Sequence, residues 1–275
     1  MSVLRFVGPV LLSGTAACAG GAGPASPPVR LVEWERGIAL QSREDPATAL
    51  YLWFYEWNMF DAVKAGEHTN GSFRHPRTVA EDGRSAEIRA DEMGLRLEAR
   101  AAADGAELVL TARNRSDHDW PELAGIIPCF SPGMDKSGGP ATPEFANEKT
   151  FFPGPRGLEP LVRRTIHWNR AFRSKVDARA TGGRFAWTDK WPSAEPDSEA
   201  GLIVRESNDG RWAAGIAWSQ WLSVQGHNPW RCMHLCARVG PLKPGESRTL
   251  RGRLYLLRGS AEDVLARYRR DFGPG

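Results

Sequence analysis

Polar and apolar side chains alternate along the segment that follows Trp230, as they do in a strand with one buried face. One set of alternate positions holds Met233, Leu235, Ala237 and Val239, and the other holds Cys232, His234, Cys236 and Arg238. Successive side chains of a strand point to opposite faces of its sheet, so the apolar set predicts a face packed against a core. We expect the polar set to line a surface or a cleft.

Two hairpins predict an antiparallel sheet. The first runs from Gly94 to Asn114 and turns at Asp104-Gly105, a dipeptide that favours a tight turn. The second runs from Gly201 to Trp218 and turns at Asn208-Asp209-Gly210. Further strands are predicted at Val29 to Glu35, Gly37 to Ser42, Ala49 to Trp57, Ala124 to Phe130, Thr165 to Asn169, Arg184 to Thr188 and Ser247 to Leu257.

One helix is predicted at the C-terminal end. Ser260 and Asp263 have the spacing of a capping box, and Gly273 ends the segment. Between them lies one apolar stripe, made of Val264, Leu265, Tyr268 and Phe272. The pattern as a whole predicts an all-β fold: one large antiparallel β-sandwich of the supersandwich kind, residues 29–275, with a C-terminal helix packed against it.

The N-terminal residues have the order of an export signal. A short basic start is followed by the apolar residues Phe6 to Leu12 and then by small residues. Ala17-Cys18-Ala19 suits an ordinary signal peptidase, whereas Thr15 to Cys18 resembles a lipobox, in which Cys18 would carry a lipid and tether the protein to a membrane. We therefore expect residues 1–19 to be a signal peptide or lipoprotein signal and residues 20–28 a flexible linker. The expected location is the periplasm or cell envelope, with no transmembrane span.

Charge and motifs exclude several function classes. The net charge of +3 is spread along the chain, whereas a nucleic-acid groove requires a clustered basic stripe. The chain has no P-loop, GxGxxG, HExxH, paired CxxC or GxSxG motif, so nucleotide-binding, zincin and α/β-hydrolase functions have no motif support. The 29 Gly and 20 Pro are distributed as turn residues between many short strands.

The loop before the alternating segment carries groups that suit a neutral polyhydroxylated ligand. Amide side chains make directional hydrogen bonds to hydroxyls, and indole faces stack on the C–H side of a sugar ring. The predicted substrate-binding residues are Asn228, Trp230, Arg238, Gln225, Trp191 and Asp189. If the protein is an enzyme, His234 and His227 would do acid–base chemistry, and Glu206 would be the carboxylate within reach of a His.

The tryptophans are predicted to divide between the core and the ligand. We assign Trp53, Trp57, Trp212 and Trp218 to the core, and Trp187, Trp191, Trp221 and Trp230 to strand ends and loops beside polar groups. Exposed tryptophan also serves protein interfaces. The first functional hypothesis is thus a carbohydrate-binding or carbohydrate-processing protein of epimerase, hydrolase or lyase type. The alternative is a non-catalytic envelope module whose Trp-rich surface binds a protein partner.

The cysteines leave two arrangements open. Cys232 and Cys236 lie about 13 Å apart along one strand and cannot pair with each other. Either Cys129 pairs with one of them, or the three are free buried thiols. Because alternate side chains of one strand project in parallel, Cys232, His234 and Cys236 are not expected to converge on a metal. We expect no metal and no cofactor.

Three segments resemble exported bacterial β-sandwich proteins of carbohydrate metabolism, of the galactose-mutarotase-like kind. They are LVLTARNRSDHDWP after the first hairpin, the strand AGIIPCF, and Leu242 to Ser247 before the last strand. This resemblance implies a sugar bound on a concave sheet face, with His residues and a carboxylate near the reacting carbon. RESNDGRWAAGIAW and QGHNPWRCMHL also resemble an uncharacterised family of exported bacterial proteins.

Overall fold

The computed structural model describes residues 26–56, 75–91, 94–132, 145–181 and 191–273. The predicted signal, most of the linker, the predicted strand at residues 184–188, Asp189, Trp57 and Trp187 lie outside these ranges. The strands are β1 (Val29–Trp34), β2 (Gly37–Ser42), β3 (Ala49–Glu56), β4 (Arg77–Val79), β5 (Ser85–Ala90), β6 (Leu95–Ala102), β7 (Gly105–Arg113), β8 (Gly125–Pro132), β9 (Thr150–Gly154), β10 (Gly157–Pro160), β11 (Ile166–Trp168), β12 (Leu202–Glu206), β13 (Trp212–Trp218), β14 (Trp221–Gln225), β15 (Met233–Arg238) and β16 (Ser247–Arg258).

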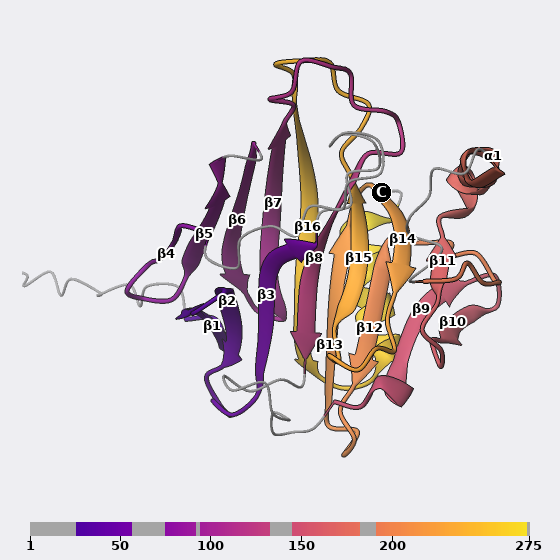
Figure 1. Ribbon diagram of the computed structural model, residues 1–275. Helices are drawn as coiled ribbons and strands as arrows, with labels where there is room; N and C mark the ends of the chain where they lie inside the picture. The colour runs from indigo at the N-terminus through magenta and orange to yellow at the C-terminus, as the bar shows by residue number, and fades with distance from the viewer. Residues whose placement is uncertain (1–25, 57–74, 92–93, 133–144, 182–190, 274–275) are drawn as a thin grey trace, which may run out of the picture.

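These strands form two antiparallel sheets that face each other (Figure 1). The seven-stranded sheet has the order β1-β2-β3-β8-β15-β14-β11, and the nine-stranded sheet has the order β10-β9-β12-β13-β16-β7-β6-β5-β4. The main core lies between them and is filled by aliphatic and aromatic side chains such as Leu97, Phe130 and Trp218. The predicted β-sandwich and both predicted hairpins are confirmed.

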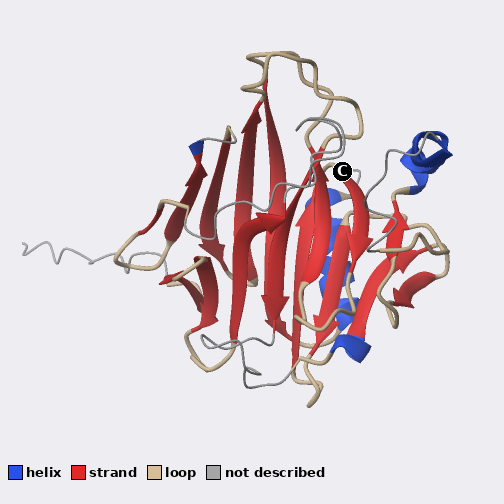
Figure 2. Cartoon of the chain, viewed as in Figure 1, coloured by secondary structure: helices blue, strands red, loops and turns tan. Residues whose placement is uncertain are grey.

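The predicted C-terminal helix is α3 (Ala261–Phe272), and both hydrogen bonds of its capping box are present at Ser260 and Asp263. Its apolar stripe packs on the outer face of β12 and β13, where Val264 and Leu265 are buried. Figure 2 shows the helix behind the strands. Within the described ranges, no helix has the length and apolar character that a membrane crossing requires.

Shorter helical segments were not predicted. They are α1 (Arg173–Thr181) and the 3-10 turns η2 (Asn147–Lys149) and η3 (Arg170–Phe172). The α1 sequence lacks a strong apolar stripe, which is the signal that identified α3. It follows η3 directly and places Val176 against the outer face of the seven-stranded sheet.

The outer face of the seven-stranded sheet is also largely covered. One apolar cluster there contains Trp34, Tyr51 and Trp53, and a second contains Trp168 and Trp191. The side chains between these two clusters belong to β8, β14 and β15. This face therefore includes the segment whose polar alternation predicted a site.

Candidate functional site

The strand β15 divides its side chains between the two faces as predicted. Met233, Leu235 and Ala237 lie in the main core between the sheets. Cys236 belongs to the cluster on the opposite, outer face, and His234 shares its parity. His234 is only 2 % exposed, however. The prediction of parity is confirmed, whereas the expectation that this imidazole lines an open cleft is not met in the described residues.

Strand register aligns His234 with side chains from three neighbouring strands. Gln225 of β14 is its partner on one side and Cys129 of β8 on the other, and Cys129 is in turn paired with Trp53 of β3. Trp191 approaches the imidazole edge-on, with 5.7 Å between ring centroids. The result is a buried polar row in an aromatic surrounding, on the sheet face that points away from the main core.

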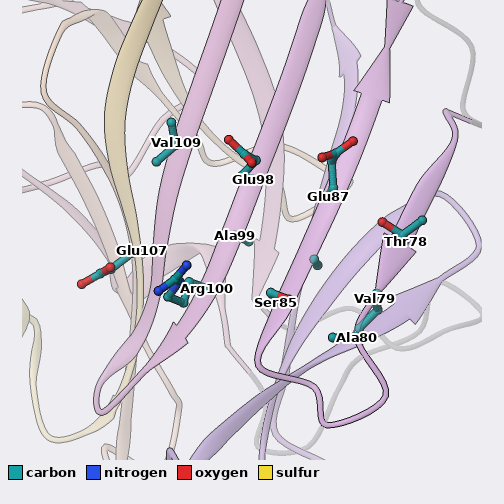
Figure 3. A pocket seen from close by; sticks show the side chains of 11 residues that line it. Thr78, Val79, Ala80, Ser85, Glu87, Glu98, Ala99, Arg100, Glu107 and Val109 are labelled. Atoms are coloured by element: carbon teal, nitrogen blue, oxygen red, sulfur yellow. The ribbon is translucent and has the colours of Figure 1, made fainter.

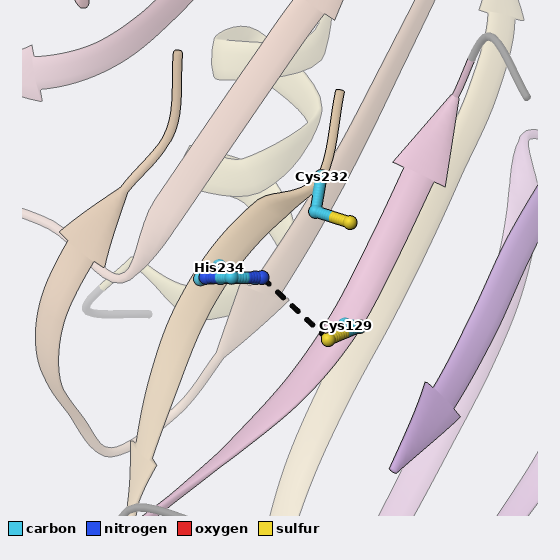
Figure 4. Close-up of side chains that lie close together, drawn as sticks. All are labelled: Cys129, Cys232 and His234. Atoms are coloured by element: carbon cyan, nitrogen blue, oxygen red, sulfur yellow. Dashed lines mark hydrogen bonds between the residues drawn. The ribbon is translucent and has the colours of Figure 1, made fainter. Parts of the chain in front are cut away.

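Three of these neighbours form a compact group, which we call the thiol–imidazole cluster: Cys129, Cys232 and His234. Their Sγ and imidazole nitrogen atoms all lie within 4.8 Å of one another, and all three residues are buried. Cys129 Sγ and His234 Nε2 are 3.5 Å apart, and Figure 4 shows the side chains directed toward one another. The three described cysteines, Cys129, Cys232 and Cys236, are buried thiols that form no disulfide within the described residues, as one of the two predicted arrangements states.

Alternate side chains project in parallel only within a single strand, and side chains of neighbouring strands can converge. Cys236 lies outside the cluster, and burial raises the pKa of its thiol far above the ordinary value. Its place is taken by Cys129, which comes from the neighbouring strand. Residues that are remote in sequence converge here because cross-strand pairs lie closer together than alternate residues of one strand.

The loop between β14 and β15 is organised by Asn228. Its Oδ1 accepts hydrogen bonds from Trp230 N (3.0 Å) and Cys232 N (3.2 Å), and its Nδ2 donates to Cys232 O (2.7 Å). Asn228 is 1 % exposed. These contacts make it a residue that shapes the loop rather than one that faces a ligand. His227 and Arg231 have φ angles of 56° and 57°, a region that non-glycine residues seldom adopt.

Trp230 is the exposed part of this loop. Its side chain is 59 % exposed, and the guanidinium carbon of Arg164 lies 5.4 Å from its ring centroid. The same carbon lies 4.7 Å from the ring of Trp191, which is buried. Arg164 thus sits between a surface indole and a buried one that contacts His234. Arg164 was not predicted as a site residue, because the Arg163-Arg164 pair has the appearance of solvated surface.

A histidine–carboxylate pair adjoins the same loop. His227 Nε2 lies 3.9 Å from Glu148 Oε1, and the His227 side chain is partly exposed. Glu148 belongs to η2, which is tied to the loop by a hydrogen bond from Asn147 Nδ2 to Asn228 O (2.8 Å). A carboxylate near a histidine was predicted, but Glu148 was not identified as that carboxylate, since no local signal links these two segments. The surface formed by Arg164, Trp230, His227 and Glu148 is called the Trp230 surface below.

Arg205 of β12 is fully buried and forms hydrogen bonds both to the β14–β15 loop and to η2. It donates hydrogen bonds to Arg231 O (2.7 Å), Asn147 Oδ1 (3.0 Å) and Thr150 Oγ1 (2.7 Å). Burial lowers the pKa of its guanidinium to about 10, and the charge of the nearby Cys232 thiol opposes this shift. One buried cation therefore connects η2, the loop and the thiol–imidazole cluster.

Two further predicted residues lie away from this surface. Glu206 accepts a hydrogen bond from Ala261 N (2.7 Å) at the start of α3, on the outer face of the nine-stranded sheet. It satisfies a free amide at the helix N-terminus, and the structure does not bring it to a histidine of the site. Arg238 lies on the same sheet face as His234 but about 13 Å farther along the strand. Its guanidinium donates to Gly240 O (2.7 Å) and Gln220 Oε1 (2.8 Å).

Of the remaining predicted residues, Gln225 is fully buried beside His234, and Trp221 packs into the main core instead of facing a ligand. The register of β14 shifts between Trp221 and Ser223, and this bulge accompanies the position of the Trp221 side chain on the core face of the sheet. Asp189 lies outside the described residues. The structure therefore brings together Trp191, Trp230, His227, Gln225 and His234, and separates Glu206 and Arg238 from them.

A hollow of about 590 Å³ lies elsewhere, over β4, β5, β6 and β7 of the nine-stranded sheet. Figure 3 shows that its charged groups include Glu87, Glu98 and Arg100. Arg96 bridges the two glutamates at 2.6 and 3.0 Å. These ion pairs are solvent-exposed and already partnered, which is the ordinary composition of a solvated sheet face.

No family model matches the chain, and no curated protein matches it in sequence. Solved structures show a distant likeness. A galactose mutarotase-like protein from Lactobacillus casei has a TM-score of 0.42 and 10 % identity, covering 84 % of this chain and 98 % of its own. A galactose mutarotase related enzyme from Lactobacillus acidophilus has a TM-score of 0.40 and 10 % identity, covering 86 % and 97 %. A polysaccharide lyase, also 10 % identical, has a TM-score of 0.38 and covers 86 % of this chain but 33 % of its own.

Proposed function

We propose that the protein is an exported carbohydrate-binding or carbohydrate-processing protein whose ligand occupies the Trp230 surface. One observation carries the proposal. The exposed indole of Trp230 is stacked with Arg164, while His227 and Glu148, from separate segments, approach to 3.9 Å in the adjoining loop. An aromatic face, a cation and a histidine–carboxylate pair thus adjoin one loop.

Each of these groups has a function toward a sugar. The indole face packs against the apolar C–H side of a pyranose, and the polar side chains form hydrogen bonds with its hydroxyls. The guanidinium of Arg164 carries several hydrogen-bond donors in a fixed fork. The loop is held by Asn228 and Arg205, so little conformational entropy is lost when a ligand binds.

The pair His227 and Glu148 supports acid–base chemistry. An imidazole titrates near neutrality and exchanges protons with a carboxylate or with a substrate hydroxyl. At 3.9 Å the two groups are close enough to act on one substrate atom and too far apart for a hydrogen bond to occupy both. His234 is buried within the thiol–imidazole cluster, so the acid–base role passes to His227.

Sugar binding is tested by calorimetry or thermal shift with a panel of mono- and oligosaccharides. We expect Trp230→Ala to weaken binding at least tenfold, because the stacking face is lost. Val109→Ala is the matched control, since Val109 is an exposed apolar side chain on the other sheet. A wild-type protein that binds no glycan, or a Trp230→Ala variant that binds as tightly as wild type, would contradict the proposal.

Turnover is tested separately on any sugar that binds. His227→Asn is expected to retain binding and to lose mutarotation, hydrolysis or elimination, followed by polarimetry and by reducing-end and unsaturated-product assays. Equal turnover by this variant and the wild type would remove the acid–base role and leave a binding protein.

The alternative is a partner-binding module with a Trp-rich surface. Eight of the nine described tryptophans are buried (Trp34, Trp53, Trp120, Trp168, Trp191, Trp212, Trp218 and Trp221), and Trp230 is exposed. A single exposed indole beside titratable groups favours a small ligand over a broad hydrophobic interface.

Export is supported by the basic, apolar and small-residue order of residues 1–19. Cell fractionation and mass spectrometry of the mature N-terminus test it. Removal of residues 1–19 without a lipid would indicate an ordinary signal peptidase, a lipid on Cys18 would indicate anchoring, and an intact cytoplasmic chain would contradict export.

A further inference from the structure

The thiol–imidazole cluster has the donor set of a soft-metal site. Two sulfur atoms and one imidazole nitrogen lie within 4.8 Å of one another, in an aromatic surrounding that includes Trp53 and Trp191. Thiolate and imidazole are the ligands that copper(I) and zinc select, whereas magnesium and calcium require oxygen. The cluster is separate from the Trp230 surface, and the inference below does not depend on sugar binding.

The geometry favours a shared metal over a disulfide. Cys129 is directly opposite His234, so Cys232, two residues earlier, is the diagonal neighbour of Cys129. Diagonal residues of an antiparallel pair have Cα atoms about 7–8 Å apart, which is beyond the usual span of a disulfide. Two metal–sulfur bonds of about 2.3 Å each bridge a separation of nearly 4 Å between sulfur atoms. The observed 3.5 Å from Cys129 Sγ to His234 Nε2 is about the ligand–ligand distance of such a site.

The local charge selects the ion. Arg205 is fully buried and donates to the carbonyl oxygen of Arg231, the residue that precedes Cys232. Within the described residues its guanidinium donates to uncharged oxygens of Thr150, Pro132, Arg231 and Asn147, so no hydrogen-bonded carboxylate neutralises its charge. Arg231 and Glu148 also act on Arg205, and their opposite charges cancel. Two thiolates, one monovalent cation and the Arg205 cation then sum to zero. A divalent ion would leave a net positive charge in a buried site, which is costly.

A second observation points to a ligand on this face. Gln225 is fully buried, is paired across the sheet with His234, and its Oε1 has no hydrogen-bond partner in the described part of the chain. Buried acceptors are normally satisfied. An acceptor in this position can receive the N–H of an imidazole whose other nitrogen binds a metal, which is the usual arrangement around a metal-bound histidine.

We propose that the protein binds one copper(I) ion through Cys129 Sγ, Cys232 Sγ and His234 Nε2. On binding, the two thiols lose their protons to solvent, the imidazole coordinates in its neutral form, and the copper keeps its oxidation state. The function is metal binding on the sheet face opposite the main core, within a shell of aromatic side chains that excludes water.

The test is an anaerobic titration of the reduced full-length protein with copper(I), in competition with a colorimetric copper(I) chelator. A Cys18→Ser background leaves Cys129, Cys232 and Cys236 as the only thiols. We expect one ion per chain, with release of two protons near neutral pH. Cys129→Ser, Cys232→Ser and His234→Gln should each weaken binding about 100-fold or more, because each removes a ligand.

Cys236→Ser is the matched control. It removes a buried thiol from the same strand face, outside the cluster, and should leave copper affinity unchanged. X-ray absorption of the wild-type complex is independent of whether any variant folds, and should show two sulfur ligands and one imidazole. Failure of the wild type to retain copper, a different ligand set, or an equal loss in Cys236→Ser would each overturn the proposal. Displacement of copper by an equal concentration of zinc(II) would overturn the choice of ion.

Discussion

The two sheets of the sandwich use their outer faces differently. Part of the nine-stranded sheet is covered by α3 and is apolar there, while the part over β4 to β7 is exposed and carries paired charges. Both parts have the side chains that their surroundings require, since apolar residues suit the face that α3 covers and charged residues suit the face that water solvates. The outer face of the seven-stranded sheet is covered and yet holds a histidine, a glutamine and one thiol in a cross-strand row, with a second thiol on the diagonal. A buried polar group costs folding free energy unless it is hydrogen-bonded, so the buried polar row is an unusual feature for a covered sheet face.

The largest effect should come from removing the aromatic cover of that face. Trp53→Ala is expected to lower the free energy of unfolding by about 3–5 kcal/mol, because it leaves a cavity beside Cys129. Val109→Ala on the exposed part of the other sheet should change it by about 0.5 kcal/mol or less. Urea denaturation of both variants measures the contrast, and equal values would show that the two faces do not differ as described.

Asn228→Ala should follow in size, at about 2–3 kcal/mol. Three hydrogen bonds to loop backbone are lost, and buried amides are left without an acceptor. The same variant should weaken sugar binding through loss of loop order, although Asn228 is not exposed. Calorimetry and denaturation are compared on one sample. A destabilised variant with unchanged affinity would mean that the loop conformation is not required by the ligand.

The stability contributed by ion pairs near α3, on the nine-stranded sheet, should depend more on acid pH than that of the outer face of the seven-stranded sheet. Asp104 is paired with Arg253, Arg267 and Arg270 near α3. Burial acts to raise the pKa of Asp104, but the Arg253 hydrogen bond and charge outweigh it, so the pKa is lowered below the ordinary 3.8. Because the folded-state pKa lies below the unfolded one, this stabilisation is present above about pH 3.8 and is lost as the pH falls through the folded-state value.

Asp104→Asn tests this pH dependence. At pH 7 the variant should be less stable by about 2 kcal/mol, the contribution of hydrogen bonds to a charged group. The difference from wild type should narrow below pH 3.8, as followed by thermal unfolding. A difference that stays constant over the whole pH range would indicate that Asp104 acts through packing instead of charge.

Glu206→Ala should have a smaller effect on stability, and it tests whether the outer face of the nine-stranded sheet contributes to ligand binding. Loss of the carboxylate that accepts from Ala261 N is expected to cost about 1 kcal/mol, as for other helix N-terminal contacts. Sugar and copper affinity should not change, because Glu206 lies on the outer face of the other sheet. A loss of either affinity at unaltered stability would reinstate Glu206 as a site residue.

The smallest effect is expected for Arg96→Ala. Its ion pairs with Glu87 and Glu98 are exposed, so solvent screening leaves them little net contribution. Denaturation in low and high salt should give no measurable difference from the wild type. A clear, salt-dependent loss would show that the hollow over β5 and β6 is more organised than an ordinary solvated face.

Local features of the chain were predictable from sequence. The alternation in β15, the two hairpin turns and the capping box of α3 depend on residues that are neighbours in the chain, and each is confirmed. The period of a strand decides on which side His234 points. The same sequence information predicted Trp230 as a loop residue, and the structure exposes it.

Tertiary structure decided which of these residues meet. Cys129 reaches His234 through the β8–β15 register, Arg164 stacks between Trp191 and Trp230, and Glu148 approaches His227, none of which follows from spacing along the chain. Glu206 has the right chemistry for the site but faces α3 instead. The physical reason is that side-chain parity is a property of one strand, whereas register and loop docking are set by packing between segments far apart in sequence.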